Sequence, residues 1–281
     1  MKEFLSLIRF PNLLLIVLSQ ALVQASLLSA GINFSGIVTP DFLVLTLSTV
    51  FIAAAGYIIN DYYDVKIDAI NKPERVVVGK SIRRRPAMFI HMLLSFAGIV
   101  LGFWLSLPVG LINVGAVLLL WGYSDRLKKL PLAGNLVIAL LSASMLLVVA
   151  VYAGKLNNIT ISYAVFAFLI SLIREIVKDM EDVRGDASFD CRTIPIVLGM
   201  RRAKYVLYPI IALFQAFLLV VIFHPVTNTR FDIYMLLLVL LPSIWMTVKL
   251  ARADRKRDFT YLSNLGKLIM LTGILSMLLI N

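Results

Sequence analysis

Nine long apolar stretches constrain this chain more than any other feature of its sequence. Each is about 20 residues long, which at 1.5 Å per residue lets an α-helix cross the ~30 Å hydrocarbon core of a bilayer. The stretches lie near residues 10–30, 41–60, 87–107, 108–124, 132–154, 159–178, 203–224, 231–249 and 260–280. Apolar residues make up 60% of the chain and charged residues 15%, which excludes an ordinary soluble, disordered or fibrous protein. The sequence therefore predicts an all-α, polytopic membrane protein whose nine transmembrane helices form a single domain over residues 1–281.

Basic residues predict the orientation of these helices. All but three of the 27 Lys and Arg lie in the N-terminus and in the connections near 61–86, 125–131, 174–204 and 249–258. The exceptions are Lys155, Arg230 and Lys267. By the positive-inside rule these connections and the N-terminus face the cytoplasm. Topology thus explains most of the net charge of +11 without nucleic acid, and no feature indicates an obligate protein partner.

The N-terminus and the cysteine content say little about processing. The single Cys191 excludes an internal disulfide. No small-residue cleavage site clearly follows the first apolar stretch, so we expect it to remain as a helix. We therefore expect a multi-pass protein of the cell (inner) membrane with a cytoplasmic N-terminus.

Acidic residues are concentrated in two short segments. Nine of the 16 lie in 61–68 and 175–190, at the cytoplasmic ends of the second and sixth predicted helices. A carboxylate near hydrocarbon is costly and is usually paired, solvated or functional. The acids could simply balance nearby Lys and Arg, but two clusters of matching spacing and depth favour a shared function.

The first cluster forms a stripe if its helix continues past the membrane edge. Asn60, Asp64 and Asp68 then fall within an arc of about 80°, with Asp61 close to Asp68. Like charges placed in this way destabilise a helix unless a counter-ion is present. A hard divalent cation with oxygen ligands would remove that penalty.

The second cluster repeats the pattern. Glu175, Asp179, Asp182 and Asp186 span an arc of about 60°, whereas Glu181 points the opposite way and is expected to be solvated or paired. Two acidic stripes suit Mg²⁺, which is held by carboxylates together with substrate phosphates. Zinc is disfavoured, because the two histidines are expected at opposite membrane faces. The predicted metal ligands are Asn60, Asp61, Asp64, Asp68, Asp179, Asp182 and Asp186.

Both motifs resemble those of UbiA-type intramembrane prenyltransferases. Residues 60–68 are similar to the family's N-D-x-x-D-x-x-x-D motif, and residues 179–186 to its second motif, D-x-x-D-x-x-x-D. The resemblance covers nearly the whole chain. It implies a helical bundle with a lateral opening to lipid and a cytoplasmic-side cap over the active site. It also implies that both motifs bind Mg²⁺ and a prenyl diphosphate.

The resemblance extends to basic residues around the diphosphate. Lys128 matches the end of the family's Y-S-x-x-x-K pattern, which begins at Tyr123, and Arg9 resembles an N-terminal Arg at the cavity edge. Breaking an allylic C–O bond creates a carbocation and a diphosphate. Mg²⁺ on Asp64 and Asp182, together with Lys128, would stabilise the diphosphate. Aromatic faces would stabilise the cation, with candidates at Tyr57, Tyr62, Tyr63 and Tyr123, although Tyr is also common at membrane interfaces.

The acceptor is expected to come from the bilayer, and the loop after the first motif bears on its identity. Relatives have R-P-x-x-x-G here, whereas this chain has Arg75 and Gly79 but Val76 in place of Pro. The residue sequences of both motifs are most similar to those of the digeranylgeranylglyceryl phosphate synthase branch of the family. Enzymes of that branch alkylate the hydroxyl of a prenylated glycerol phosphate. Basic loop residues could bind that phosphate, namely Lys72, Arg75, Lys80, Arg83, Arg84 and Arg85. The alternative is an aromatic acceptor in quinone biosynthesis.

Two other classes fit less well. Secondary transporters usually carry their acidic residues near the midplane, on broken helices in inverted repeats. CDP-alcohol phosphatidyltransferases also bind Mg²⁺ through aspartates, but their D-G-x-x-A-R motif is not found. The sequence thus favours a prenyltransferase whose partners are a prenyl diphosphate, a lipophilic acceptor and membrane lipid.

Overall fold

Long helices dominate the computed structural model, which describes residues 2–28, 32–224 and 228–280. The α-helices are α1 (Lys2–Leu7), α2 (Phe10–Leu22), α3 (Pro40–Asn71), α4 (Arg84–Leu105), α5 (Leu107–Asp125), α6 (Ala133–Tyr152), α7 (Asn158–Ala187), α8 (Ile194–Leu198), α9 (Met200–Ile222), α10 (Thr229–Met235), α11 (Leu241–Arg252) and α12 (Lys256–Leu275). Within the described ranges, nine helical segments are long and apolar enough to cross a membrane. The predicted all-α, nine-span architecture is confirmed.

The two helices that carry the acidic motifs are longer than the sequence predicted. The apolar stretches ended near residues 60 and 178, but α3 continues to Asn71 and α7 to Ala187. Their 32 and 30 residues give lengths of about 48 and 45 Å, well beyond a ~30 Å core. Asn157 begins α7 by accepting a hydrogen bond from the Thr160 N–H. Both motifs therefore lie on uninterrupted helix, as the stripe argument requires.

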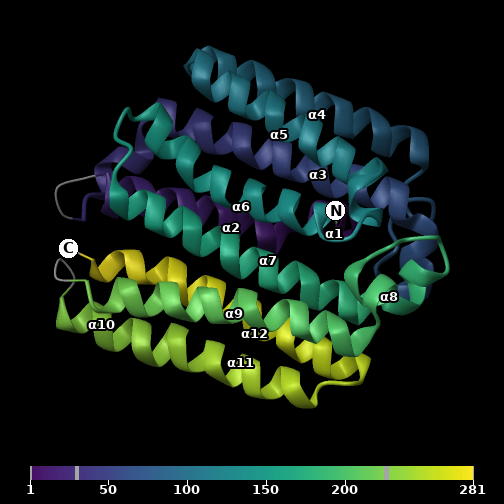
Figure 1. The fold of residues 1–281 in the computed structure, drawn as a ribbon. Coiled ribbons are helices and arrows are strands. Elements are labelled where there is room, and N and C mark those ends of the chain that lie inside the picture. The colour runs from purple at the N-terminus through teal and green to yellow at the C-terminus, as the bar shows by residue number, and fades with distance from the viewer. Residues whose placement is uncertain (1, 29–31, 225–227, 281) are drawn as a thin grey trace.

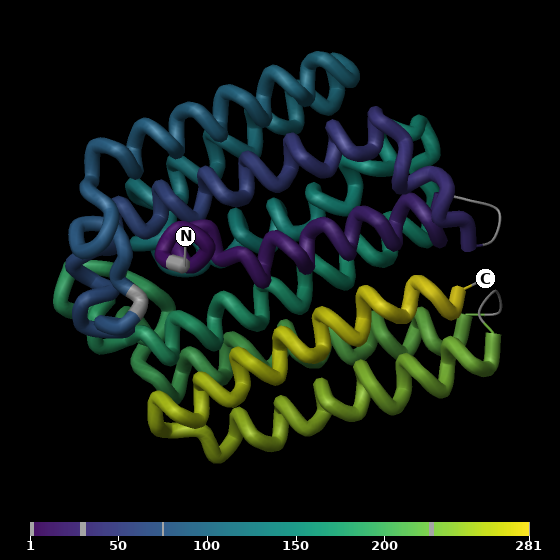
Figure 2. Tube along the Cα trace, turned by 180° about the vertical axis from the view of Figure 1, so that it is seen from behind, coloured from purple at the N-terminus to yellow at the C-terminus, as the bar shows by residue number. Residues whose placement is uncertain are grey.

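Helix α7 occupies the middle of the bundle (Figure 1). It packs against α6 on one side and α12 on the other, and α3, α4 and α5 pack together beyond α6. From behind, α2 and α12 are neighbours on the same face (Figure 2). Large apolar side chains such as Phe96 and Trp104 remain 67% and 81% exposed, as expected for surfaces that face lipid rather than water.

A π-helical turn directly before α11 is hydrogen-bonded to α12. Pro242 has no N–H, and its ring crowds the carbonyl four residues earlier, at Leu238. Residues Leu236–Leu240 form a π-helical turn there, and the Thr272 hydroxyl donates to the Leu238 carbonyl oxygen at 2.9 Å. This bond satisfies a backbone acceptor that bilayer lipid could not. It also anchors α12, the helix that carries Lys267.

The acidic ends of α3 and α7 lie at one end of the bundle, here called the acidic end. Three connections meet there: 72–83, 126–132 and 188–199. Arg192 N–H donates to the Lys129 carbonyl at 2.8 Å, and Lys256 Nζ donates to the Asn71 carbonyl at 2.5 Å. These bonds join the connection after α7 to the connection before α6, and the start of α12 to the end of α3.

Candidate active site

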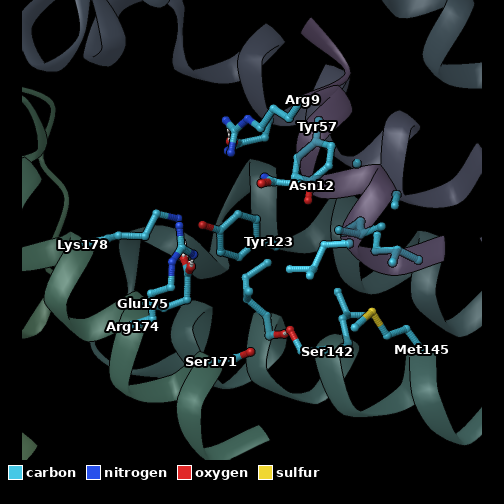
Figure 3. A pocket seen from close by; sticks show the side chains of 18 of the residues that line it. Arg9, Asn12, Tyr57, Tyr123, Ser142, Met145, Ser171, Arg174, Glu175 and Lys178 are labelled. Atoms are coloured by element: carbon cyan, nitrogen blue, oxygen red, sulfur yellow. Dashed lines mark hydrogen bonds and ion pairs between the residues drawn. The ribbon is translucent and has the colours of Figure 1, made fainter. Parts of the chain in front are cut away.

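One cavity of about 1230 Å³ contains both acidic motifs. Side chains from α2, α3, α5, α6, α7 and α12 line it. Its acidic end is polar, whereas the deeper part is lined by apolar side chains, including Leu15, Leu18, Ile112, Met145 and Val148. Figure 3 shows Met145 at one side of the cavity and the Arg174–Lys178 segment at the other. The cavity therefore has one charged end continuous with an apolar chamber.

The first carboxylate row, Asp61, Asp64 and Asp68 on α3, is held by two cations from outside α3 and by Asn60 within it. Lys128 Nζ lies 2.5 Å from Asp64 Oδ1, and Asn60 Nδ2 donates to Asp64 Oδ2 at 2.7 Å. Arg9 Nη2 lies 2.9 Å from Asp61 Oδ1. All five of these side chains, with Asp68, line the cavity. The structure thus brings together the first-motif residues and both of the expected cations.

The second row consists of Asp179, Asp182 and Asp186 on α7. It is contacted by Lys72, directly after α3, and by Asn135 on α6. Lys72 Nζ contacts Asp182 Oδ2 at 2.6 Å, which links the segment after α3 to α7. Asn135 Nδ2 on α6 donates to Asp179 Oδ2 at 2.9 Å. Asp179, Asp182 and Asp186 all line the cavity, and all three are helical because α7 continues through Gly185.

Asn71, the last residue of α3, connects the two motif helices by hydrogen bonds to α7. Its side-chain oxygen accepts from the Gly185 N–H at 2.9 Å, and its Nδ2 lies 3.4 Å from Asp186 Oδ1. A Cβ at Gly185 would lie within 2.5–2.6 Å of the Asn71 amide group. The end of α3 therefore approaches α7 at a point where only glycine leaves room.

The donor set fits Mg²⁺. Asp182 Oδ1 is buried and has no hydrogen-bond partner, although such an oxygen ordinarily needs a donor or a cation. Neighbouring carboxylates are oriented by Asn side chains, the kind of outer contact that metal-ligating carboxylates have. Among the described residues no group of three or more His, Cys, Asp or Glu forms a protein-only metal cage. Mg²⁺ does not require one, because one or two carboxylates plus substrate phosphates and waters complete its shell.

Arg9 enters the site through a strained turn. It sits between α1 and α2 with φ 50° and ψ 53°, in the left-handed region that is uncommon for residues other than glycine. The turn aims its guanidinium at Asp61 and places it 5.0 Å from the Tyr57 ring centroid. Burial lowers the pKa of Arg9, but Asp61 and Tyr57 outweigh burial, so the pKa is raised and the group stays charged.

The aromatic candidates divide into two pairs. Tyr57 and Tyr123 line the cavity, whereas Tyr62 and Tyr63 do not. Tyr62 instead lies beneath the Arg84 guanidinium, 4.6 Å from ring centroid to Cζ. Only the first pair can face a cation formed inside the cavity.

Several sequence-based predictions need correction. Arg83, Arg84 and Arg85 are exposed at the start of α4 and do not line the cavity. Lys80 is also absent from the lining, and the side chain of Arg75 lies outside the described residues. Glu175, expected in the metal-facing stripe, is instead paired with Arg174 at 3.0 Å and Lys178 at 2.9 Å.

Glu181 lies outside the cavity and is paired, as its position opposite the acidic stripe predicted. It is not part of the cavity lining, and it accepts a hydrogen bond from Thr260 Oγ1 at 2.8 Å. The periodicity argument separated it correctly from Asp182, its neighbour in sequence.

Other cavity residues had no assigned role at the sequence level. They are Asn71, Asn135, Arg174, Lys178 and Lys267, and Lys72 had only been considered for the acceptor. Lys267 carried one usable signal, since it lay well inside a predicted span and away from its ends. Cys191 also lines the cavity, but burial and Asp186 raise the pKa of its thiol to about 11, so it is protonated at neutral pH and is a poor nucleophile.

Comparison with known proteins decides the family. A model of the UbiA prenyltransferase family matches residues 17–267. The chain belongs to this family. The sequence-based recognition is therefore confirmed.

Individual relatives agree with this assignment. A digeranylgeranylglyceryl phosphate synthase from Thermococcus gammatolerans is 39% identical over 59% of this chain, and the chain spans 58% of that relative's length. A synthase of the same name from Korarchaeum cryptofilum is 32% identical over 90% of both chains. A solved structure concerning digeranylgeranylglyceryl phosphate synthase in membranes is 26% identical, covers 99% of this chain and 98% of its own, and superposes with a TM-score of 0.71. A UbiA homologue from Archaeoglobus fulgidus bound to GPP and Mg²⁺ shares the fold, at 18% identity over 98% and 99% of the two chains and a TM-score of 0.71.

Proposed function

We propose that this UbiA-family protein transfers a prenyl group from a prenyl diphosphate to the hydroxyl of a prenylated glycerol phosphate, with Mg²⁺ as cofactor. The observation that carries the proposal is one cavity in which two carboxylate rows and several cations adjoin an apolar chamber. A diphosphate fits the first part and an isoprenoid chain the second. The name and extent of the similar synthases support the glycerol-phosphate acceptor.

The chain's own residues would bind and polarise the donor. Lys128 and Arg9 stand at the first row, and Lys72 at the second, within reach of diphosphate oxygens. Asn60, Asp61, Asp64, Asp68, Asp179, Asp182 and Asp186 would hold Mg²⁺, which supplies Lewis-acid stabilisation of the leaving diphosphate. Ion pairs such as Lys128–Asp64 keep the rows neutralised before donor binding and free an ammonium for phosphate afterwards.

The reaction then needs a dry chamber and a positioned acceptor. The C–O bond between the prenyl C1 and the diphosphate breaks, and its electron pair leaves with the diphosphate. A new C–O bond forms to the acceptor hydroxyl, which loses its proton. Tyr57 and Tyr123 line the chamber where the allylic cation would form, and their ring faces can stabilise it.

The membrane placement is part of the same proposal. The protein is a multi-pass membrane protein, and we propose that residues 1–281 form one domain of the cell (inner) membrane. The acidic end would face the cytoplasm, with the connections 72–83, 126–132 and 188–199 as its cap. The basic residues that gather in these connections support this orientation.

A product assay tests the function directly. Purified protein in lipid nanodiscs receives Mg²⁺, a labelled C20 diphosphate, and competing prenylated glycerol phosphate and aromatic acceptors, and the product is identified by mass. The proposal requires the glycerol-phosphate ether, Mg²⁺ or Mn²⁺, and loss of both turnover and donor affinity in chelator. Transfer to the aromatic acceptor alone would overturn it, and donor affinity unchanged in chelator would overturn the metal clamp.

A further inference from the structure

Three basic residues line the cavity at or below the level of the second carboxylate row. Arg174 and Lys178 project from α7, and Lys267 projects from α12. They are called the inner basic cluster. Arg174 lies eight residues before Asp182, about 12 Å deeper along α7. The start of α12 is at the acidic end, and Lys267 is eleven residues further, about 16 Å deeper.

The α12 turn that precedes Lys267 packs against Arg174, because a Cβ at Gly266 would lie 3.6 Å from the Cβ and Cγ of Arg174. In Figure 3 the Tyr123 hydroxyl points towards the group formed by Arg174, Glu175 and Lys178. The side chains of Arg174 and Lys178 are only 16% and 26% exposed. Charges in such a place are costly, and in membrane proteins they mark functional sites.

Arg174 has unused hydrogen-bonding capacity. Arg174 Nε is buried and has no hydrogen-bond partner, although Nη1 of the same guanidinium bonds Glu175. Arg174 and Lys178 share the single Glu175 carboxylate, so these three groups carry a formal charge of +1. That charge would attract a phosphate monoester, whose oxygen would accept the orphaned N–H. Glu175 would meanwhile keep Arg174 and Lys178 oriented, through contacts of 2.9–3.0 Å.

The cluster also lies beside a lateral mouth. Leu5, Phe10 and Leu14 line the cavity from the α1–α2 side yet are 37%, 41% and 53% exposed. On the α12 side Lys267 lines the cavity and is exposed as well. Residues that are both lining and exposed define the opening, which therefore lies between α2 and α12 on the lipid-facing side. A lysine within a membrane span at that opening is suited to meet an anionic lipid.

We propose that the inner basic cluster, which lies beside the opening between α2 and α12, binds the phosphate of the lipid acceptor; this inference rests on the proposed function. Diphosphate and acceptor phosphate repel each other, so the two need separate sets of cations. Lys128, Lys72 and Arg9 serve the donor at the rows, and the inner basic cluster serves the acceptor. In a glycerol phosphate the phosphate and the reacting hydroxyl lie on nearby carbons, so a phosphate held at Arg174 and Lys178 would keep that hydroxyl in the part of the cavity just below the rows, where C1 of a row-bound prenyl diphosphate would lie.

The test uses Lys267→Gln and Arg174→Gln, with Lys249→Gln as the matched control. Lys249 lies at the end of α11, 4.6 Å from the Trp245 ring centroid, and does not line the cavity. Steady-state kinetics are measured in nanodiscs with geranylgeranylglyceryl phosphate and with its dephosphorylated alcohol as acceptors. We expect the KM for the phosphorylated acceptor to rise roughly 10- to 100-fold in both variants, the cost of one charge-assisted contact. The donor KM, the rate with the alcohol and the Lys249→Gln kinetics should change less than about twofold.

Other outcomes separate the failure of this inference from that of the proposed function. If wild-type protein uses the phosphorylated acceptor but the variants keep its KM, the inner basic cluster does not bind that phosphate. Equal rises in both KM values place the cluster at the diphosphate and overturn the inference, and so does an effect that follows the anionic lipid content of the nanodisc for both acceptors. If wild-type protein ignores glycerol-phosphate acceptors altogether, the proposed function itself fails. Lys267 is exposed, so its variant decides the matter even where Arg174→Gln does not fold.

Discussion

The two carboxylate rows lie on similar helices and have similar spacing, but they are held in different ways. The first row receives its cations from Arg9 and Lys128, each in a different connection. The second row is held by Asn135 on α6 and by Asn71 and Lys72, the last residue of the helix that carries the first row and the residue after it. The geometry of the second row thus depends on α3, whereas among the described residues the hydrogen bonds and ion pairs of the first row come from Arg9, Asn60 and Lys128, none of which belongs to α7. A change at the α3–α7 junction should therefore disturb the second row first.

The largest effect is expected from removing a carboxylate in either row. Asp64→Asn and Asp182→Asn should each lower kcat by roughly 1000-fold or more, because each removes a charge that holds Mg²⁺ at the leaving group. Turnover of the C20 diphosphate measures this, with size-exclusion profiles and Tm as checks on folding. Glu181→Gln is the matched control on the outer face of α7 and should be mild. Equal damage from Glu181→Gln and Asp182→Asn would contradict the assignment of helical faces.

The next largest effect is expected at the contact between Asn71 and Gly185, which connects the two rows. Gly185→Ala places a Cβ against the Asn71 amide, which must move and release Asp186, at a cost of roughly 1–3 kcal/mol. Gly115→Ala is the control, because nothing lies within 4 Å of a Cβ there. We expect Gly185→Ala to weaken Mg²⁺ activation about tenfold, measured as the Mg²⁺ concentration for half-maximal rate, with Gly115→Ala unchanged. An effect of the same size from both would mean that helical glycine itself, not the junction, is responsible.

Helical periodicity in the sequence was enough to predict the two carboxylate rows. It was not enough to predict the residues that bond to them. Asn60, Asp64 and Asp68 share a face because of local helical geometry, and that face needs only the continuation of α3 to Asn71. The partners of the second row are remote: Asn135 lies 44 residues from Asp179, and Lys72 lies 110 residues from Asp182. Tertiary packing alone brings such pairs together, so no spacing rule could identify them.

For the basic residues, too, the sequence alone could not predict which side chains line the cavity. Loop arginines and cavity cations are equally well explained by the positive-inside rule, which describes sidedness but not which way a side chain points. Arg174 and Lys178 counted there as topology signals, yet they line the cavity. Arg83, Arg84 and Arg85 were predicted to bind acceptor phosphate, yet they lie outside it.

A smaller effect should distinguish the cations of the two rows. Lys128→Met removes the ammonium 2.5 Å from Asp64 in a side chain only 9% exposed, whereas Lys72 is 21% exposed. We expect Lys128→Met to raise the donor KM by roughly 10-fold or more, and Lys72→Met to raise it less, because a wetter contact is weaker. Acceptor KM should stay within about twofold in both variants. Reversal of the order would place the diphosphate nearer the second row.

The smallest effect is expected at the exposed arginines of α4, and it tests the acceptor site from outside the cavity. Arg84 donates to the Tyr62 carbonyl at 3.1 Å and lies over its ring, an exposed contact worth about 1 kcal/mol or less. Replacing Arg83, Arg84 and Arg85 together by Gln should therefore change either KM by less than about twofold in correctly inserted protein. Because these charges also favour a cytoplasmic location, the yield of inserted protein can fall, and rates must be expressed per inserted molecule. A selective tenfold rise in acceptor KM would place the acceptor phosphate at this surface. Since one phosphate cannot be bound both there and at the inner basic cluster, that result would also remove the role proposed for Arg174 and Lys267.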